Sequence, residues 1–404
     1  MNELAVKLPI GPIHPMLKEP MNFTFYVEGE VVVDAEPNIG FVHRGIEKLA
    51  EKKTWFQNLY LCEKVCGICS SAHQGCYAQG AEKIFEKEPP EKALYIRTLM
   101  WELERLHSHL LWLGVIMHEI GFDTLFMYTW KDRERVLDLV ELISGRRVGY
   151  SINTIGGVRR DISYEAIKMA MDVANYIAER AQFYERVVLT ERTILDRTQG
   201  IGYLSKTDAI RLNTVGPTAR ASGVRRDVRQ DVPYGVYEES PFSVVIDTGC
   251  DVLARIIVRI REMIISAEII KWILFTMPKT GSIQVKLSPF TKPPENEAIS
   301  RVEAPRGELF YYLKSNGSQY PERVKIRTPT LANIVSVIHM VKGHYIADIP
   351  PIVAGIDPCM SCMDRVIIVD VNKEERKVLS HQELRRYSIK WYKKNRAWVR
   401  EERR

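Results

Sequence analysis

Four of the cysteines form two Cys-x-x-Cys pairs at opposite ends of the sequence. The first pair is Cys66 and Cys69 in CGIC, and the second is Cys359 and Cys362 in CMSC. This spacing lets two thiolates reach one ion from a single turn, and soft thiolates favour zinc, copper(I), iron–sulfur clusters, nickel or iron. Two such pairs can meet in the folded chain and form a four-thiolate site.

The separation of the two pairs bears on which kind of site they form. Structural zinc sites usually bring their pairs within a few tens of residues, whereas about 290 residues separate these two. A link between distant parts of a large chain favours a buried metal centre. A structural zinc site, redox-active thiols and unrelated buried cysteines are the alternatives.

The composition is that of a globular protein. The chain has 404 residues, of which 46% are hydrophobic and 27% charged, enough for one to three domains. The N-terminal sequence lacks the apolar segment of a signal peptide, and no uncharged apolar run is long enough to span a membrane. Seven cysteines in such a chain indicate a reducing compartment and favour metal ligation over disulfides.

The positive charge is concentrated at the C-terminus. Residues 385–404 hold nine basic and two acidic side chains, which gives this segment a net charge of +7. The whole chain carries +6, so the remaining residues together carry −1. This distribution argues against a nucleic-acid-binding protein. The tail is either a solvated helix or a segment that binds nucleic acid, an anionic membrane surface or an acidic partner subunit.

Hydrophobic periodicity predicts an α+β protein in which helices dominate. Residues 22–36 read as a β-hairpin, and apolar residues recur at helical spacing over 91–120, 125–145, 163–195, about 241–276 and 330–341. We predict a β-rich N-terminal region over 1–45, a helical body with both cysteine loops over 46–365, and a strand with a basic tail over 366–404.

Seven segments resemble the large subunits of [NiFe] hydrogenases. EKVCGICSSAH (63–73) resembles their first cysteine motif, and DPCMSCMDR (357–365) the second. The likeness extends to GPIHP (11–15), FVHRGIEK (41–48), GGVRRDI (156–162), VGPTARASG (215–223) and EAPRGEL (303–309). These are marks of the membrane-bound, energy-converting branch, which contains the archaeal membrane-bound hydrogenases and sulfane reductases. The branch is related to the quinone-site large subunit of respiratory complex I.

The resemblance implies a nickel–iron centre. Cys66, Cys69, Cys359 and Cys362 would bind nickel, and Cys69 and Cys362 would also bridge to an iron that carries carbon monoxide and cyanide. The same resemblance implies [4Fe–4S] clusters in a partner subunit. The fold expected from it is the helical body of a hydrogenase large subunit.

The resemblance also implies roles for four more side chains. Arg306 would place a fixed positive charge over the open coordination position, and Asp357 would hold that arginine. Glu19 would relay protons to a cysteine, and His73 would form a hydrogen bond near a bridging cysteine. The residues alone allow plainer interpretations: an ordinary ion-pair partner for Arg306, a surface acid for Glu19 and a core histidine for His73.

Three departures from the family pattern affect the expected activity. Lys64 replaces the usual arginine, and Met363 replaces a small polar residue. The chain also continues past Arg365, where many family members are cut after nickel is loaded. These departures point to the sulfane reductases of sulfur-respiring archaea, in which the nickel–iron pocket is vestigial.

Three functions therefore follow from the sequence. The first is the large subunit of a ferredoxin-fed, ion-translocating complex that reduces sulfane sulfur or polysulfide. The second is a working [NiFe] hydrogenase that reduces protons, and the third is a non-catalytic scaffold with a structural zinc site. Each implies a cluster-bearing small subunit, another hydrophilic complex I-like subunit, membrane ion-pump subunits, and a place on the cytoplasmic face of the membrane of an archaeal thermophile.

Overall fold

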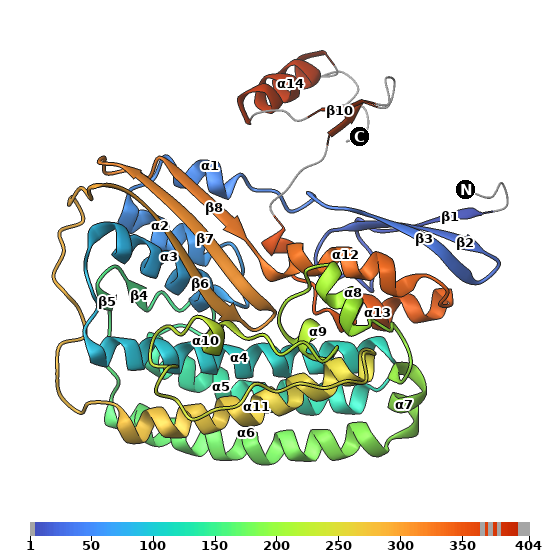
Figure 1. Cartoon of the computed structure of the whole chain (residues 1–404), viewed down its shortest axis with the longest axis horizontal. Helices are drawn as coiled ribbons and strands as arrows, with labels where there is room; N and C mark the ends of the chain where they lie inside the picture. The colour runs from blue at the N-terminus through green and yellow to red at the C-terminus, as the bar shows by residue number, and fades with distance from the viewer. Residues whose placement is uncertain (1–4, 364–367, 371–374, 378–380, 395–404) are drawn as a thin grey trace, which may run out of the picture.

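Four long helices form the base of the molecule in the computed structural model, which describes residues 5–363, 368–370, 375–377 and 381–394. They are α4 (Glu91–Glu119), α5 (Asp123–Ser144), α6 (Tyr164–Thr190) and α11 (Val252–Thr276), and they lie alongside one another (Figure 1). The face that α6 turns to the core carries alanine and β-branched residues, mostly three or four positions apart: Ala166, Ala170, Val173, Ala174, Ile177 and Ala181. This spacing gives one apolar stripe, which packs against α11.

A three-stranded antiparallel sheet covers one end of this helical layer. It consists of β6 (Glu295–Ala304), β7 (Gly307–Asn316) and β8 (Arg323–Arg327), in that order. Helices α1 (Ile46–Ala50) and α3 (Ser70–Phe85) pack against it, α3 contacts both β6 and β7, and α2 (Trp55–Glu63) packs against α3. The loop between α2 and α3 meets α4, where the His107 Nε2 lies 3.3 Å from the Ile68 carbonyl oxygen.

A second three-stranded sheet is built from the N-terminal residues. Strands β1 (Val6–Ile10), β2 (Asn22–Glu28) and β3 (Val31–Asn38) pair in sequence order, and their core is shared with α12 (Pro329–Val341) and α13 (Ile349–Gly355). The 3-10 turn η2 (Met360–Cys362) follows α13. The β-rich start of the chain thus meets the segment that carries the second cysteine pair.

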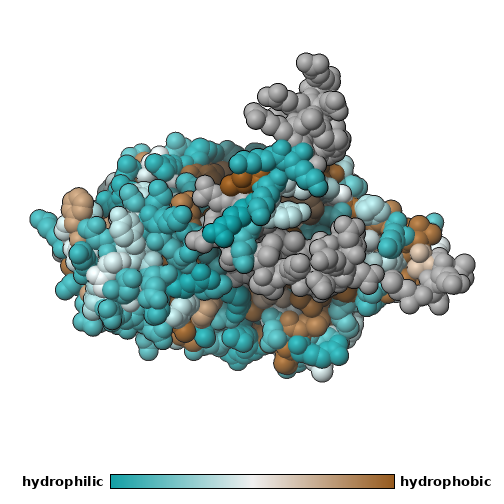
Figure 2. Space-filling model, turned by 90° about the horizontal axis from the view of Figure 1, so that it is seen from above, coloured by the Kyte–Doolittle hydropathy of each residue, from teal (hydrophilic) through white to brown (hydrophobic). Residues whose placement is uncertain are grey.

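Shorter elements connect these layers. They are β4 (Asn153–Thr154), β5 (Gly157–Val158), α7 (Arg192–Thr198), α8 (Lys206–Arg211), α9 (Pro217–Arg220), α10 (Val228–Asp231) and η1 (Ile346–Asp348). The C-terminal elements are β9 (Ile368–Asp370), β10 (Glu375–Lys377) and α14 (His381–Lys394), and Figure 1 shows α14 standing clear of the body. Seen from the side of α14, the surface is mostly hydrophilic, with separate hydrophobic patches (Figure 2).

The predicted fold class is confirmed, with two differences in helix bounds. The helix predicted over 241–276 begins only at Val252, because the Asp251 side chain accepts a hydrogen bond from the Ala254 N–H and caps the helix there. The helix predicted over 163–195 is two helices, since the backbone of Glu191 is extended. Within the described residues, no helix is long and apolar enough to cross a membrane.

Candidate metal centre

The two cysteine pairs converge in one buried pocket. The Cys66 sulfur lies 3.4 Å from that of Cys359, and the Cys69 sulfur lies 4.0 Å from that of Cys362. Within the second pair the sulfurs are 3.2 Å apart. The sulfurs of Cys66, Cys69 and Cys362 all lie within 4.8 Å of one another. The convergence expected from the sequence is therefore present.

Short segments at two helical ends place these sulfurs. The backbone N–H groups of Ile68 and Cys69 donate hydrogen bonds of 3.3 and 3.2 Å to the Cys66 sulfur, which shapes the first loop around that atom. In the second loop, the Cys359 N–H donates to the Thr330 hydroxyl over 3.1 Å. The Thr328 hydroxyl donates to the Cys362 carbonyl over 2.9 Å. Backbone donors to a sulfur favour its thiolate form.

The four thiols share their protons unequally. Hydrogen bonds from Cys359, Cys362 and Cys69 lower the pKa of Cys66 well below its usual value, against the effect of burial. Hydrogen bonds from Cys362 lower the pKa values of Cys69 and Cys359, but hydrogen bonds to Cys66 and burial raise both values overall. The pKa of Cys362 is raised, first by its hydrogen bond to Cys359. A soft cation would replace these shared protons, so the donor set fits a thiolate-bound metal.

Arg306 lies beside the cysteines in the turn between β6 and β7. Its Nε donates to the Asp357 carbonyl over 2.9 Å and its Nη2 to the Asp357 carboxylate over 2.7 Å. Its Nη1 donates to the Ser108 hydroxyl over 3.3 Å. Burial lowers the pKa of Arg306, but the charges of Asp357 and the cysteines raise it well above its ordinary value overall. The guanidinium is thus a permanent positive charge at the pocket.

Asp357 combines an unusual backbone conformation with its ion pair to Arg306. Its φ of 56° lies in the left-handed region, where aspartate is one of the few tolerated side chains. Burial raises the pKa of its carboxyl above the ordinary value, while the charge of Arg306 opposes this shift. The residue lies two positions before Cys359, so the ion pair ties the Arg306 turn to that loop.

His73 contacts the centre from helix α3. Its Nε2 lies 3.7 Å from the Cys362 sulfur, and its Nδ1 lies 2.8 Å from the Tyr311 hydroxyl. Burial lowers the pKa of His73 to about 4, so the imidazole is neutral near pH 7. A neutral imidazole carries one N–H, and the Tyr311 hydroxyl can donate to Nδ1 when that proton is on Nε2. No motif in the sequence marks Tyr311 as a partner of His73.

Glu19 reaches the second cysteine loop from the segment between β1 and β2. Its carboxylate accepts hydrogen bonds from the backbone N–H of Ser361, over 2.8 Å, and from the Ser361 hydroxyl. Ser361 lies between the two cysteines of that pair. Its carbonyl accepts a 2.9 Å hydrogen bond from Arg44, which also donates to the Lys64 and Val65 carbonyls over 2.8 Å each. Arg44 therefore joins the two loops, although only its motif was noted from the sequence.

A cavity of about 260 Å³ opens beside these residues. Arg306, Asp357, Cys359 and Glu19 line it, together with mainly apolar side chains. The ion pair between Lys18 and Glu119, 2.6 Å long, lies at the same cavity. The arrangement provides a space in which a small reactant can meet both the cysteine loop and a fixed positive charge.

Comparisons with known proteins agree with this geometry. The profile described as "Respiratory-chain NADH dehydrogenase, 49 Kd subunit" matches residues 119–291 and 286–365, and the one described as "Nickel-dependent hydrogenase" matches 44–120. The membrane-bound hydrogenase subunit alpha of Pyrococcus furiosus is 40% identical, over 96% of this chain and 93% of that protein. Formate hydrogenlyase subunit 5 of Escherichia coli is 38% identical, over 96% of this chain and 69% of that protein.

A solved structure is similar over nearly the whole chain. It is described as the membrane-bound sulfane sulfur reductase, an archaeal respiratory membrane complex, and one of its chains superposes with a TM-score of 0.86. That chain is 31% identical, over 90% of this protein and 100% of its own length. The fold and the four-thiol pocket define a hydrogenase-type large subunit. The chain belongs to the family that unites nickel-dependent hydrogenase large subunits with the 49 kDa subunit of respiratory NADH dehydrogenase.

Proposed function

We propose that this chain is the large subunit of a membrane-bound, ion-translocating [NiFe] hydrogenase that reduces protons with electrons from ferredoxin. The convergence of all four cysteine sulfurs beside Arg306 is the observation that carries this proposal. The likeness to the Pyrococcus furiosus membrane-bound hydrogenase supports it. The sequence alone favoured sulfane reduction with a vestigial pocket. We favour proton reduction because the chain is 40% identical to the membrane-bound hydrogenase subunit but 31% identical to the sulfane sulfur reductase chain.

Cys66, Cys69, Cys359 and Cys362 would hold the nickel–iron centre through their thiolates. When bound, this centre supplies the redox chemistry that turns protons and electrons into hydrogen. Since a metal-bound thiolate only accepts hydrogen bonds, the Nε2–H of His73 would donate to the Cys362 sulfur, 3.7 Å away.

At the same pocket, Glu19 would transfer protons and Arg306 would supply a fixed positive charge. The Glu19 carboxyl accepts a hydrogen bond from the Ser361 hydroxyl, so a proton can pass between Glu19 and the second cysteine loop. Arg306 stays charged throughout, because an arginine does not deprotonate in proteins, and Asp357 fixes its direction. A lysine at this position would lose the two-point contact with Asp357.

The same proposal includes the surroundings of the subunit. A small subunit with [4Fe–4S] clusters would pack near the cysteine loops, because electron transfer requires short distances. Membrane ion-pump subunits would lie near the segment with Glu19, and another hydrophilic subunit would complete the complex on the cytoplasmic face. The basic helix α14 would contact one of these subunits.

Sulfane reduction is the second candidate, and the structural match to a sulfane sulfur reductase favours it. In that case ferredoxin electrons would reduce an S–S bond at the cavity beside Cys359, and the four cysteines would hold no nickel. The two candidates share the fold and the membrane complex. They differ in metal content and in the electron acceptor.

Nickel content and product analysis of the purified complex separate the two candidates. We expect one nickel per chain and hydrogen evolution with reduced ferredoxin, and Cys362→Ala should abolish both. Cys250→Ala removes a buried thiol that belongs to neither pair and serves as the matched control. A nickel-free complex that reduces polysulfide and evolves no hydrogen would refute the hydrogenase proposal. One zinc per chain, with turnover unaltered in Glu19→Gln, would point to the scaffold.

A further inference from the structure

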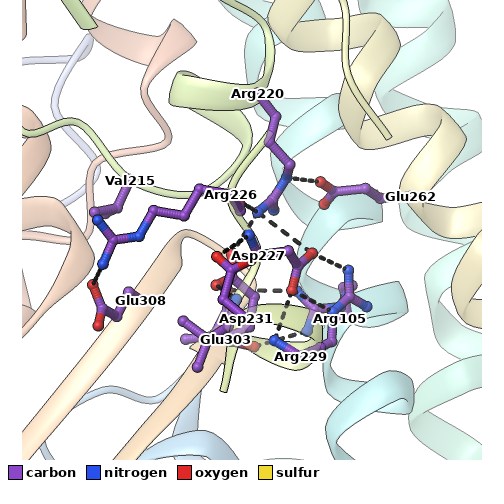
Figure 3. Close-up of polar contacts among 12 residues, drawn as sticks. Arg105, Val215, Arg220, Arg226, Asp227, Arg229, Asp231, Glu262, Glu303 and Glu308 are labelled. Atoms are coloured by element: carbon purple, nitrogen blue, oxygen red, sulfur yellow. Dashed lines mark hydrogen bonds and ion pairs between the residues drawn. The ribbon is translucent and has the colours of Figure 1, made fainter. Parts of the chain in front are cut away.

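The guanidinium of Arg306 can act on the pocket only if its turn is held in place. The strands β6 and β7 end at the pair Ala304 and Gly307, so Arg306 lies in a two-residue turn at the tip of a hairpin. Asp357 and Ser108 bind the side chain but not the strands that lead to it. Buried charged residues from other elements surround the tip, several of them drawn in Figure 3.

Arg105 of helix α4 holds the backbone directly before the turn. Its Nη2 donates a 2.7 Å hydrogen bond to the Glu303 carbonyl, and its Nη1 donates a 3.4 Å bond to the Ala304 carbonyl. Arg105 is fully buried, and its Nε lies 3.3 Å from the carboxylate of Glu102 on the same helix. One planar guanidinium thus fixes two successive carbonyls of β6 relative to α4.

The side chain of Glu303 anchors the hairpin to a second region. Its carboxylate accepts hydrogen bonds from Arg220 Nη1 over 2.7 Å and from the Val228 N–H over 3.1 Å. Arg220 also donates to Glu262 of α11 over 2.8 Å. Figure 3 shows Arg220 between the two acids, so one guanidinium links the hairpin tip to α11.

The backbone before α9 touches the turn itself. A Cβ atom added to Gly216 would lie 2.4 Å from both the Arg306 carbonyl oxygen and the Gly307 Cα. A Cβ atom added to Gly307 would lie 2.7 Å from the Gly216 nitrogen. Glycine at both positions permits this approach, so backbone contact confines the turn in addition to its side-chain contacts.

We propose that Arg105, Arg220 and Glu303 are positioning residues that set where the Arg306 guanidinium lies at the cysteine pocket. Buried ion pairs give little net stability, because desolvation cancels much of their attraction, but their hydrogen bonds define geometry. The three residues hold the hairpin from two directions, from α4 and from α9 together with α11. The step from position to turnover rests on the proposed function, whereas the positioning itself does not.

Hydrogen–deuterium exchange of the purified complex tests the positioning directly. Glu303→Gln keeps the volume of the side chain but replaces one of its two accepting oxygens by an NH2 group, which cannot accept from Arg220 or the Val228 N–H. Arg105→Lys keeps the charge but not the two-carbonyl contact. We expect both variants to speed exchange of the amides of residues 303–309 about tenfold or more. Glu297→Gln is the matched control, since Glu297 is an exposed acid at the far end of β6. Unchanged exchange in both variants would overturn the proposal.

A double-mutant cycle tests whether this position serves turnover through Arg306. We expect Glu303→Gln to lower kcat about tenfold to a hundredfold with KM and nickel content unchanged, as small misplacements of reacting groups do. In Arg306→Lys the further loss from Glu303→Gln should be much smaller, because both changes remove the same interaction. Additive losses would overturn the link to Arg306. A result in which Arg306→Lys leaves turnover intact, while Glu303→Gln and Arg105→Lys still speed the amide exchange of residues 303–309, would refute the proposed role of Arg306 in turnover. It would not refute the role of the three residues in positioning the turn.

Discussion

Replacing Gly216 by alanine should displace the Arg306 turn at a calculable cost. Gly216 has φ 68° and ψ −151°, a combination that is essentially restricted to glycine, and any other residue there costs on the order of 1–3 kcal/mol. The added Cβ would also lie 2.4 Å from two backbone atoms of the turn, which cannot rotate away. Overpacking of this kind adds about 1–3 kcal/mol. The free energy of unfolding should therefore fall by about 4 kcal/mol.

Gly200→Ala separates the two contributions. Gly200 also has a positive φ, 73°, but a Cβ atom there would meet no atom within 4 Å. Its replacement should cost only the backbone strain of a left-handed residue, about 1–2 kcal/mol. Denaturant unfolding of the full chain, followed by one spectroscopic signal for both variants, gives the difference. If Gly216→Ala destabilises the protein no more than Gly200→Ala, the close contact between Gly216 and the turn is not real.

Two further predictions concern buried hydrogen-bonding groups. Burial raises the pKa of Glu303 from 4.5 to about 7, so the folded state binds this proton more tightly than the unfolded state. The free energy of unfolding should therefore fall as pH rises from 4.5 to 7. In Glu303→Gln, urea unfolding across that range should show a smaller fall, by at most about 1.4 kcal/mol per pH unit. Tyr311→Phe should cost about 1–3 kcal/mol in the same assay, because it leaves the buried Nδ1 of His73 without its donor, whereas Tyr312→Phe, at an exposed hydroxyl, should cost less than about 0.5 kcal/mol.

The long helices and the pairing of the two cysteine loops were predictable from the sequence, for different reasons. Helix α4 spans Glu91–Glu119, almost as the apolar spacing over 91–120 indicated, because a buried helix repeats its pattern many times. The prediction that Cys66 meets Cys359 rested on the chemistry of thiolates and on the family resemblance. No periodic signal connects two loops so far apart in the sequence.

The supports of the pocket were not predictable in the same way. Arg105, Arg220 and Glu303 have residue types that are ordinarily solvated. Arg220 and Glu303 lie in motifs noted from the sequence, but neither motif indicated that its charged side chain is buried. The hydrogen bonds from Arg105 and Arg220 to Glu303 join positions 198 and 83 residues apart, so they arise only from the tertiary packing. The start of α11 was missed for a local reason, since Asp251 caps the helix at a point where apolar residues continue on both sides.

Helix α4 shows how one element can place both halves of the pocket. Glu104 accepts hydrogen bonds of 2.6 and 2.9 Å from the N–H groups of Ser71 and Ala72, at the start of the helix that follows Cys69. One turn later, Ser108 binds the Arg306 guanidinium, and Arg105 holds the strand before it. Positions three and four apart share a helix face, so these polar residues face the pocket together within an otherwise apolar helix. The distance between the first cysteine loop and the fixed positive charge is thus set by a single rigid helix, whichever acceptor receives the electrons.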